Sequence, residues 1–168
     1  MQLDFVGKPR GGYLSWRKHK ENSFKVICYM TNWAQYRPNA TKYTPSHIDP
    51  HLCTHLIYAF AAINVSNHEI KAFEWNDESK EDLVGKKKLV FFKFVKLLKE
   101  FLFQGRYEEF NLLKLKNPNL KTLLAVGGWN MGSKPFSDMS KNDTYRHTFI
   151  RSAVKLLRAY KFDGLGKF

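Results

Sequence analysis

The stretch Leu120-Lys-Thr-Leu-Leu-Ala-Val-Gly-Gly-Trp-Asn130 decides the fold of this chain. Its segment Lys121–Val126 is mostly apolar, as are the buried strands of parallel sheets. The pair Gly127-Gly128 ends this strand, and glycine permits a positive φ or a close approach of the backbone. Trp129 follows at once, so its indole is predicted to lie at the carboxyl end of a buried strand.

Similar segments occur on both sides of this strand. Apolar, β-prone runs predict further strands, and a helical spacing of apolar residues predicts helices between them. The polar stretch 37–50 has room for one short helix. This alternation predicts an α/β protein with a parallel sheet or barrel, in which the loops after the strands carry the chemistry. The further strands are Phe24–Tyr29, His55–Phe60 and Phe162–Leu165, and the helices are 107–116 and Thr144–Tyr160, the latter capped by Asn142 or Asp143.

Length and charge limit the possible classes of protein. The chain has 168 residues with 43% hydrophobic content, which suits a globular protein, but a complete (β/α)₈ barrel needs about 250 residues. The net charge of +13 would suggest a nucleic acid or an anionic membrane as partner. However, much of this charge lies in two segments outside the strand–helix pattern, residues 1–23 with +3 and residues 80–106 with +5. No nucleic-acid-binding motif is present either. We therefore expect no nucleic-acid partner.

Two segments stand outside the strand–helix pattern. Residues 1–23 are polar and rich in glycine, so we expect a disordered leader without a visible signal peptide. Residues 80–106 interrupt the alternation and contain a basic amphipathic run, Leu89–Phe103. Three interpretations of this insertion remain open: a membrane-surface or partner-binding element, a surface insertion, or sequence not selected to fold here. No apolar stretch is long enough to span a membrane, and a membrane partner is not expected.

The two cysteines, Cys28 and Cys53, are either buried thiols or one disulfide between neighbouring strands. Glycosylation sequons favour the disulfide, because they suggest an oxidising, secretory origin. His51 and His55 lie four apart, but they straddle the start of a strand, so we expect no metal site there. The sequons are Asn39-Ala-Thr41, Asn64-Val-Ser66 and Asn142-Asp-Thr144.

Five short motifs follow one another in the chain: Cys28-Tyr-Met-Thr-Asn-Trp-Ala-Gln-Tyr-Arg-Pro38, Ile48-Asp-Pro-His-Leu-Cys-Thr-His-Leu-Ile-Tyr-Ala-Phe-Ala61, Phe73-Glu-Trp-Asn-Asp77, Leu120–Asn130 and Phe162-Asp-Gly-Leu165. Together and in this order they resemble glycoside hydrolase family 18, the chitinases and chitinase-like lectins of animals. The resemblance covers roughly residues 24–79 and 107–165. It implies the N-terminal part of a (β/α)₈ TIM barrel, roughly its first three to four strands, in an extracellular protein without a cofactor whose ligand is chitin or chitooligosaccharides.

The same resemblance implies that the catalytic residues are missing. The family's signature is Asp-x-x-Asp-x-Asp-x-Glu, in which the Glu protonates the leaving oxygen and the neighbouring Asp orients the substrate's acetamido group. Asp163 matches the first Asp, whereas Gly166 and Phe168 stand at the second and third, and the Glu position lies two residues further on. We therefore expect a truncated, inactive chitinase-like chain, or a non-catalytic lectin, and interpret Asp163 as structural.

The resemblance also implies a sugar-binding cleft. Aromatic faces stack on pyranose rings while amides and backbone groups bind hydroxyls. For Trp33 and Trp75, core packing remains an equal alternative. The residues that match the cleft are Tyr29, Phe60, Gly127, Gly128, Trp129 and Asn130, and those that match its flank are Trp33, Tyr36, Glu74 and Trp75.

Overall fold

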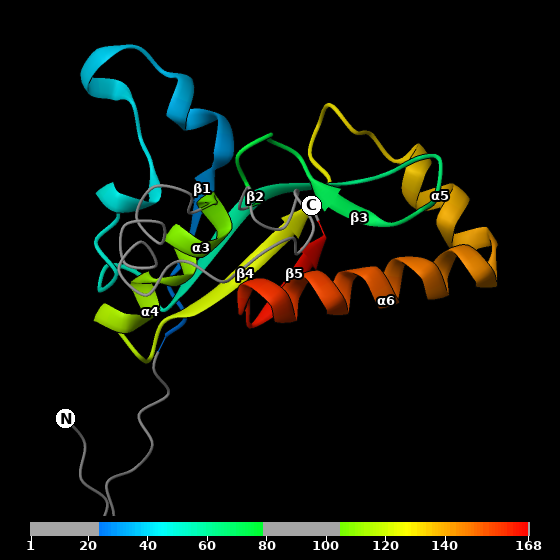
Figure 1. Ribbon diagram of the computed structural model, residues 1–168. Coiled ribbons are helices and arrows are strands. Elements are labelled where there is room, and N and C mark those ends of the chain that lie inside the picture. Colours follow the sequence, from blue (N-terminus) through cyan, green and yellow to red (C-terminus); the bar gives the residue numbers. More distant parts are fainter. Residues whose placement is uncertain (1–23, 79–104, 168) are drawn as a thin grey trace, which may run out of the picture.

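The computed structural model describes residues 24–78 and 105–167 (Figure 1). Four parallel strands form a sheet in the order β1-β2-β4-β5, and β3 pairs antiparallel with the end of β2. This confirms the predicted α/β class with a parallel sheet. The predicted leader 1–23 and the run Leu89–Phe103 lie outside the described residues. The strands are β1 (Ile27–Thr31), β2 (His55–Ile63), β3 (Ile70–Ala72), β4 (Lys121–Val126) and β5 (Gly164–Lys167).

Helices cover one face of this sheet (Figure 1). The longest, α6, begins where the Asn142 side chain accepts a hydrogen bond of 3.2 Å from the Tyr145 backbone, and it ends at Lys161 with φ 63°. None of the helices in the described ranges is long and apolar enough to cross a bilayer. The α-helices are α3 (Arg106–Asn111), α4 (Leu113–Lys116), α5 (Lys134–Lys141) and α6 (Asp143–Tyr160), and the 3₁₀ helices are η1 (Asn32–Tyr36), η2 (Asn39–Thr41) and η3 (Pro45–His47).

The core lies between the sheet and these helices. Tyr58 of β2 is fully buried, and its ring meets those of Tyr107 and Phe110 edge-on, with centroids 5.1 Å apart in each case. Leu124 of β4 and Leu156 of α6 join the same cluster. Successive side chains of a strand point to opposite faces, and a smaller cluster on the other face consists of Ile57, Ala59 and Ala125 with Phe60 and Leu123 packed against it.

Several predicted boundaries were wrong, because pairing with a neighbour decides where a strand begins and ends. The predicted strand Phe24–Tyr29 begins three residues later, since Ile27 is the residue that pairs with His55 at the start of β2. β2 continues past Phe60 to Ile63, because β3 supplies a partner for its end. β5 begins two residues after Phe162, where Gly164 meets Leu123.

Other elements also differ from expectation. The stretch 37–50 holds η2 and η3 rather than one short helix, and the predicted helix 107–116 is divided at Leu112. Neither β3 nor α5 was predicted. β3 has only three residues, and α5 has eight, with only Phe136 and Met139 packed partly buried against the core, so each is too short to be recognised readily by its pattern. The prediction of strand Lys121–Val126 was confirmed at both ends.

A disulfide joins Cys28 of β1 to Cys53, two residues before β2. Their Cα atoms lie 6.1 Å apart, within the usual range for a disulfide. The predicted disulfide is therefore confirmed, and the alternative of two free thiols is wrong. The bond fixes β1, an edge strand that pairs only with β2 among the described strands.

Candidate functional site

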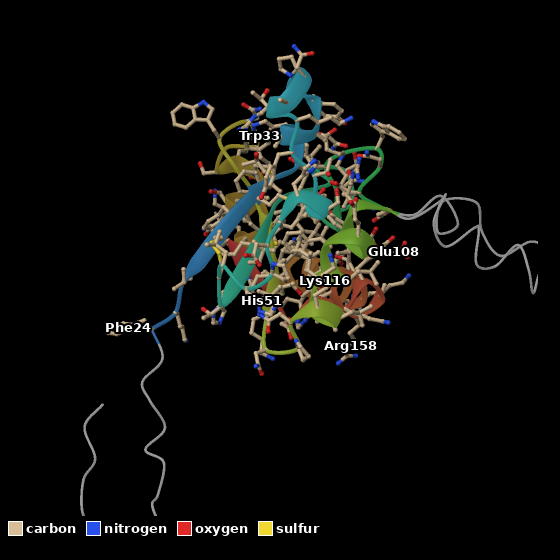
Figure 2. All side chains as sticks on the ribbon, turned by 90° about the vertical axis from the view of Figure 1, so that its left-hand side faces the viewer. Phe24, Trp33, His51, Glu108, Lys116 and Arg158 are labelled. Atoms are coloured by element: carbon tan, nitrogen blue, oxygen red, sulfur yellow. A yellow bond between two sulfur atoms is a disulfide. The ribbon has the colours of Figure 1, made fainter. Side chains whose placement is uncertain are left out.

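The candidate site lies where β1, β2 and β4 end. These strands are parallel, so their carboxyl ends meet at one edge of the sheet. In Figure 1 the segment after β1 rises beyond that edge. Figure 2 places Trp33 at this end of the molecule, and His51, Lys116 and Arg158 at the other. Trp33 is thereby separated from the labelled basic residues Lys116 and Arg158.

A pair of glycines forms the turn after β4. Gly127 has φ 121° and Gly128 has φ 97°, conformations that other residues rarely adopt. A Cβ atom on Gly128 would lie 3.0 Å from the ring of Phe60, so a side chain there would press against this ring. Trp129 comes next and is 97% exposed, which means that its indole contacts almost no other part of the described chain.

Aromatic rings continue from this turn across the end of β2. Phe60 stacks on Trp33, with ring centroids 5.9 Å apart and an interplanar angle of 26°. Tyr29 of β1 is half exposed and lies beside Ile57 in the sheet register. The turn residue Gly128, Phe60 and Trp33 therefore follow one another in contact, and each comes from a different segment of the chain.

Two loops form the outer part of the site. Tyr36 of η1 donates a hydrogen bond of 2.7 Å to the Glu74 carboxylate, and this bond raises the pKa of Tyr36 above its usual value. Trp33 is 45% exposed and Trp75 is 68% exposed, so neither indole belongs to the core. Both loops therefore present aromatic rings to solvent, and Trp33 of the first loop also stacks on Phe60.

Beneath these rings lies a polar layer that the sequence did not single out. Asp77 is fully buried, and it accepts hydrogen bonds from the Tyr58 hydroxyl and from the Glu74 backbone, the latter at 2.9 Å. Burial raises the pKa of Asp77 to about 6. Asn32 is buried as well, and its amide donates 3.2 Å to the Phe60 carbonyl. These residues stood within the quoted motifs, but only the fold shows that they are covered.

Asp163 lies at the other end of the strands, beside the start of β4 and directly before β5. It accepts a 2.8 Å hydrogen bond from the Thr122 backbone and one of 3.0 Å from Lys114. Burial by itself would raise the pKa of Asp163, but the hydrogen bonds and the lysine charge hold it below its usual value. Its carboxylate thus joins β4, α4 and the start of β5. Gly166 follows in β5, and a Cβ there would have no atom within 4 Å.

A metal site was not expected. Within residues 24–78 and 105–167, no three or more His, Cys, Asp or Glu side chains are grouped so that they could hold a metal ion. His55 makes a 2.9 Å hydrogen bond to the Thr54 hydroxyl, and His51 is exposed. The side chains of the site are mainly aromatic rings and amides, together with the Glu74 carboxylate that accepts from Tyr36.

Comparison with known proteins defines the class. Mouse chitotriosidase-1 is 44% identical over 141 residues, covering 84% of this chain and 24% of the relative. Pig oviduct-specific glycoprotein is 41% identical over 152 residues, covering 90% of this chain and 24% of the relative. A solved structure of Ostrinia furnacalis Group IV chitinase matches with a TM-score of 0.64 at 36% identity, covering 86% of this chain and 33% of that one. Human YKL-39 is described as a pseudo-chitinase with retained chitooligosaccharide binding properties. Its structure matches with a TM-score of 0.63 at 38% identity, covering 86% of this chain and 32% of that one.

Fold and site together define part of a parallel (β/α) barrel of the chitinase type, with its aromatic residues at the carboxyl ends of the strands. The profile of the family "Glycosyl hydrolases family 18" matches residues 25–166, and the chain belongs to this family. It spans about a quarter of the length of the curated relatives and about a third of the solved chains. The predicted resemblance is thus confirmed.

Proposed function

We propose that this chain binds chitooligosaccharides, which are β-1,4-linked N-acetylglucosamine, at the carboxyl ends of β1, β2 and β4. The observation that carries the proposal is the 97% exposure of Trp129 on a turn fixed by two glycines of positive φ. A solvent-facing indole that no side chain of the described ranges covers is free to stack on the apolar face of a sugar ring. If a sugar covers one face of the Trp129 indole, about 100 Å², this contact contributes at most roughly 2.5 kcal/mol to the free energy of binding.

The relatives support this choice of ligand. YKL-39 retains chitooligosaccharide binding as a pseudo-chitinase, and the Group IV chitinase has also been solved in complex with allosamidin. In this chain the cleft residues are Tyr29, Phe60, Glu74, Trp75, Gly127, Gly128, Trp129 and Asn130.

We further propose that the chain does not hydrolyse the bound sugar. Gly166 and Phe168 stand where the family signature has acidic residues, and neither can donate a proton or orient an acetamido group. Asp163, which matches the first Asp of that signature, is engaged by Thr122 and Lys114 at the opposite end of the strands from the site. The function is therefore closer to that of a lectin than to that of an enzyme.

An extracellular location forms part of the same proposal. The Cys28–Cys53 disulfide requires an oxidising compartment to persist. Asn39 and Asn142, two of the sequon asparagines, are exposed, as a glycan would require.

Retention on chitin beads tests the proposal. The wild-type chain is expected to bind, and Trp129→Ala is expected to weaken binding at least tenfold. Phe24→Ala is the matched control, because Phe24 is 90% exposed and lies three residues before β1, away from the site (Figure 2). A fluorogenic chitobioside should give no turnover. Equal retention of wild type and Trp129→Ala would contradict the proposed site, and measurable turnover would contradict the proposed lack of catalysis.

A further inference from the structure

A reciprocal pair of amides joins the two loops of the site. The Gln35 side chain of η1 donates to the Asn76 carbonyl oxygen at 3.3 Å, and the Asn76 amide donates back to the Gln35 oxygen at 2.7 Å. The two residues are 41 positions apart in the sequence. Gln35 is 6% exposed, so water competes little for these bonds. The pair therefore connects η1 to the turn that carries Glu74 and Trp75.

Each member of the pair is anchored on a second side. Gln35 also donates 2.9 Å to the Asn32 carbonyl, and Asn32 in turn donates to the Phe60 carbonyl at the end of β2. The Arg106 backbone at the start of α3 donates 2.9 Å to the Asn76 carbonyl, and the Arg106 side chain donates 3.4 Å to Gln35. A continuous set of hydrogen bonds thus runs from the sheet, through both loops, to a helix.

The aromatic rings lie on the solvent side of this network. Trp33 and Tyr36 belong to η1 with Gln35, while Trp75 directly precedes Asn76. The bond between Tyr36 and Glu74 also links the loops, but it is exposed to solvent. Because buried hydrogen bonds compete with water less than exposed ones, the amide pair is the stronger constraint on how the two loops that carry these indoles lie relative to each other.

We propose that Gln35 and Asn76 are positioning residues that hold the two loops carrying Trp33 and Trp75 in a fixed arrangement and so make the site selective for longer chitooligosaccharides. This inference rests on the proposed binding function. Trp129, Trp33 and Trp75 stand on three separate segments of the chain, so a short sugar is expected to reach the ring of one segment, whereas a longer one reaches the rings of both loops. Loops that are already ordered spare the ligand the cost of ordering them, and this gain applies only to sugars that reach both loops.

Asn76→Ala tests the inference, with Asn119→Ala as the matched control, since Asn119 is an exposed loop residue before β4. Binding of the trisaccharide and the hexasaccharide is measured by calorimetry. Asn76→Ala is expected to weaken hexasaccharide binding about tenfold, the equivalent of one aromatic contact, and to leave trisaccharide binding within about twofold. Asn119→Ala is expected to change neither. Asn76→Asp removes the donor to Gln35 with little change in size, and serves if Asn76→Ala does not fold.

Hydrogen exchange supplies a readout that does not depend on sugar. In Asn76→Ala the backbone amides of 32–37 and of 73–77 are expected to lose protection together, while β4 keeps its own. Equal weakening for both sugar lengths, or loss of protection in only one loop, would overturn the positioning role. If the wild type binds neither sugar, the proposed function fails, and the exchange experiment still decides whether the amide pair couples the loops.

Discussion

The double variant Cys28→Ala/Cys53→Ala is expected to lose a large part of the stability of this fold. The disulfide closes a loop of 25 positions, and such a constraint on the unfolded chain stabilises the folded state by about 3.5 kcal/mol. At about 4 °C per kcal/mol for a chain of this size, the melting temperature should fall by roughly 14 °C. Native domains often have only about 5–15 kcal/mol in total, so this loss is substantial.

The assay is urea denaturation followed by circular dichroism, with and without a reducing agent. Reduction should shift the wild type to the midpoint of the double variant and leave the double variant unchanged. β1 pairs only with β2 in the described sheet, so its amides should exchange first when the disulfide is absent. A difference below about 1 kcal/mol between wild type and double variant would refute the loop-closure reasoning.

Two further changes probe the site and the layer beneath it. Gly128→Ala is expected to cost about 2 kcal/mol, because alanine is strained at φ 97° and its Cβ meets the Phe60 ring at 3.0 Å; an unchanged urea midpoint would contradict this. Asp77 has a folded-state pKa of about 6, above its unfolded value of 3.8, so its contribution to stability is full below pH 4 and about 3 kcal/mol is lost as the pH rises through 6. Asp77→Asn should remove this pH dependence. Asp138→Asn, a control on α5 whose carboxylate pairs with Lys134, should keep it. The same slope in Asp77→Asn as in the wild type would assign the titration to another group.

Local sequence was sufficient where one segment contains all the information about its structure. Lys121–Val126 is apolar along its length and ends at two glycines, so its boundaries could be predicted exactly. The helix predicted as Thr144–Tyr160 begins only one residue earlier, because Asn142 supplies an N-cap that can be recognised in the sequence. The exposed position of Trp129 also follows from its place after the glycine pair.

Contacts between segments that are distant in the sequence determined the features that local sequence could not show. β3 exists because Ile70–Ala72 meets the end of β2, a contact between segments whose own patterns are weak. The amides of Gln35 and Asn76 look like ordinary polar loop residues, and their reciprocal bonds depend on two loops 41 positions apart. The burial of Asp77 likewise arises from Tyr58 and from the turn at Glu74. Such residues share no periodicity, so only the tertiary structure reveals them.

The junction between Asn76–Asp77 and Arg106–Tyr107 has a consequence for how this chain tolerates changes in length. The Arg106 and Tyr107 backbone amides donate to the carbonyls of Asn76 and Asp77 at 2.9 and 3.0 Å, so the chain returns next to the place it left. Doubling the number of residues between two fixed points adds only about 0.6 kcal/mol of closure entropy. The turn and α3 should therefore accept intervening segments of very different lengths at nearly constant stability, which makes this junction a natural place for a reporter domain.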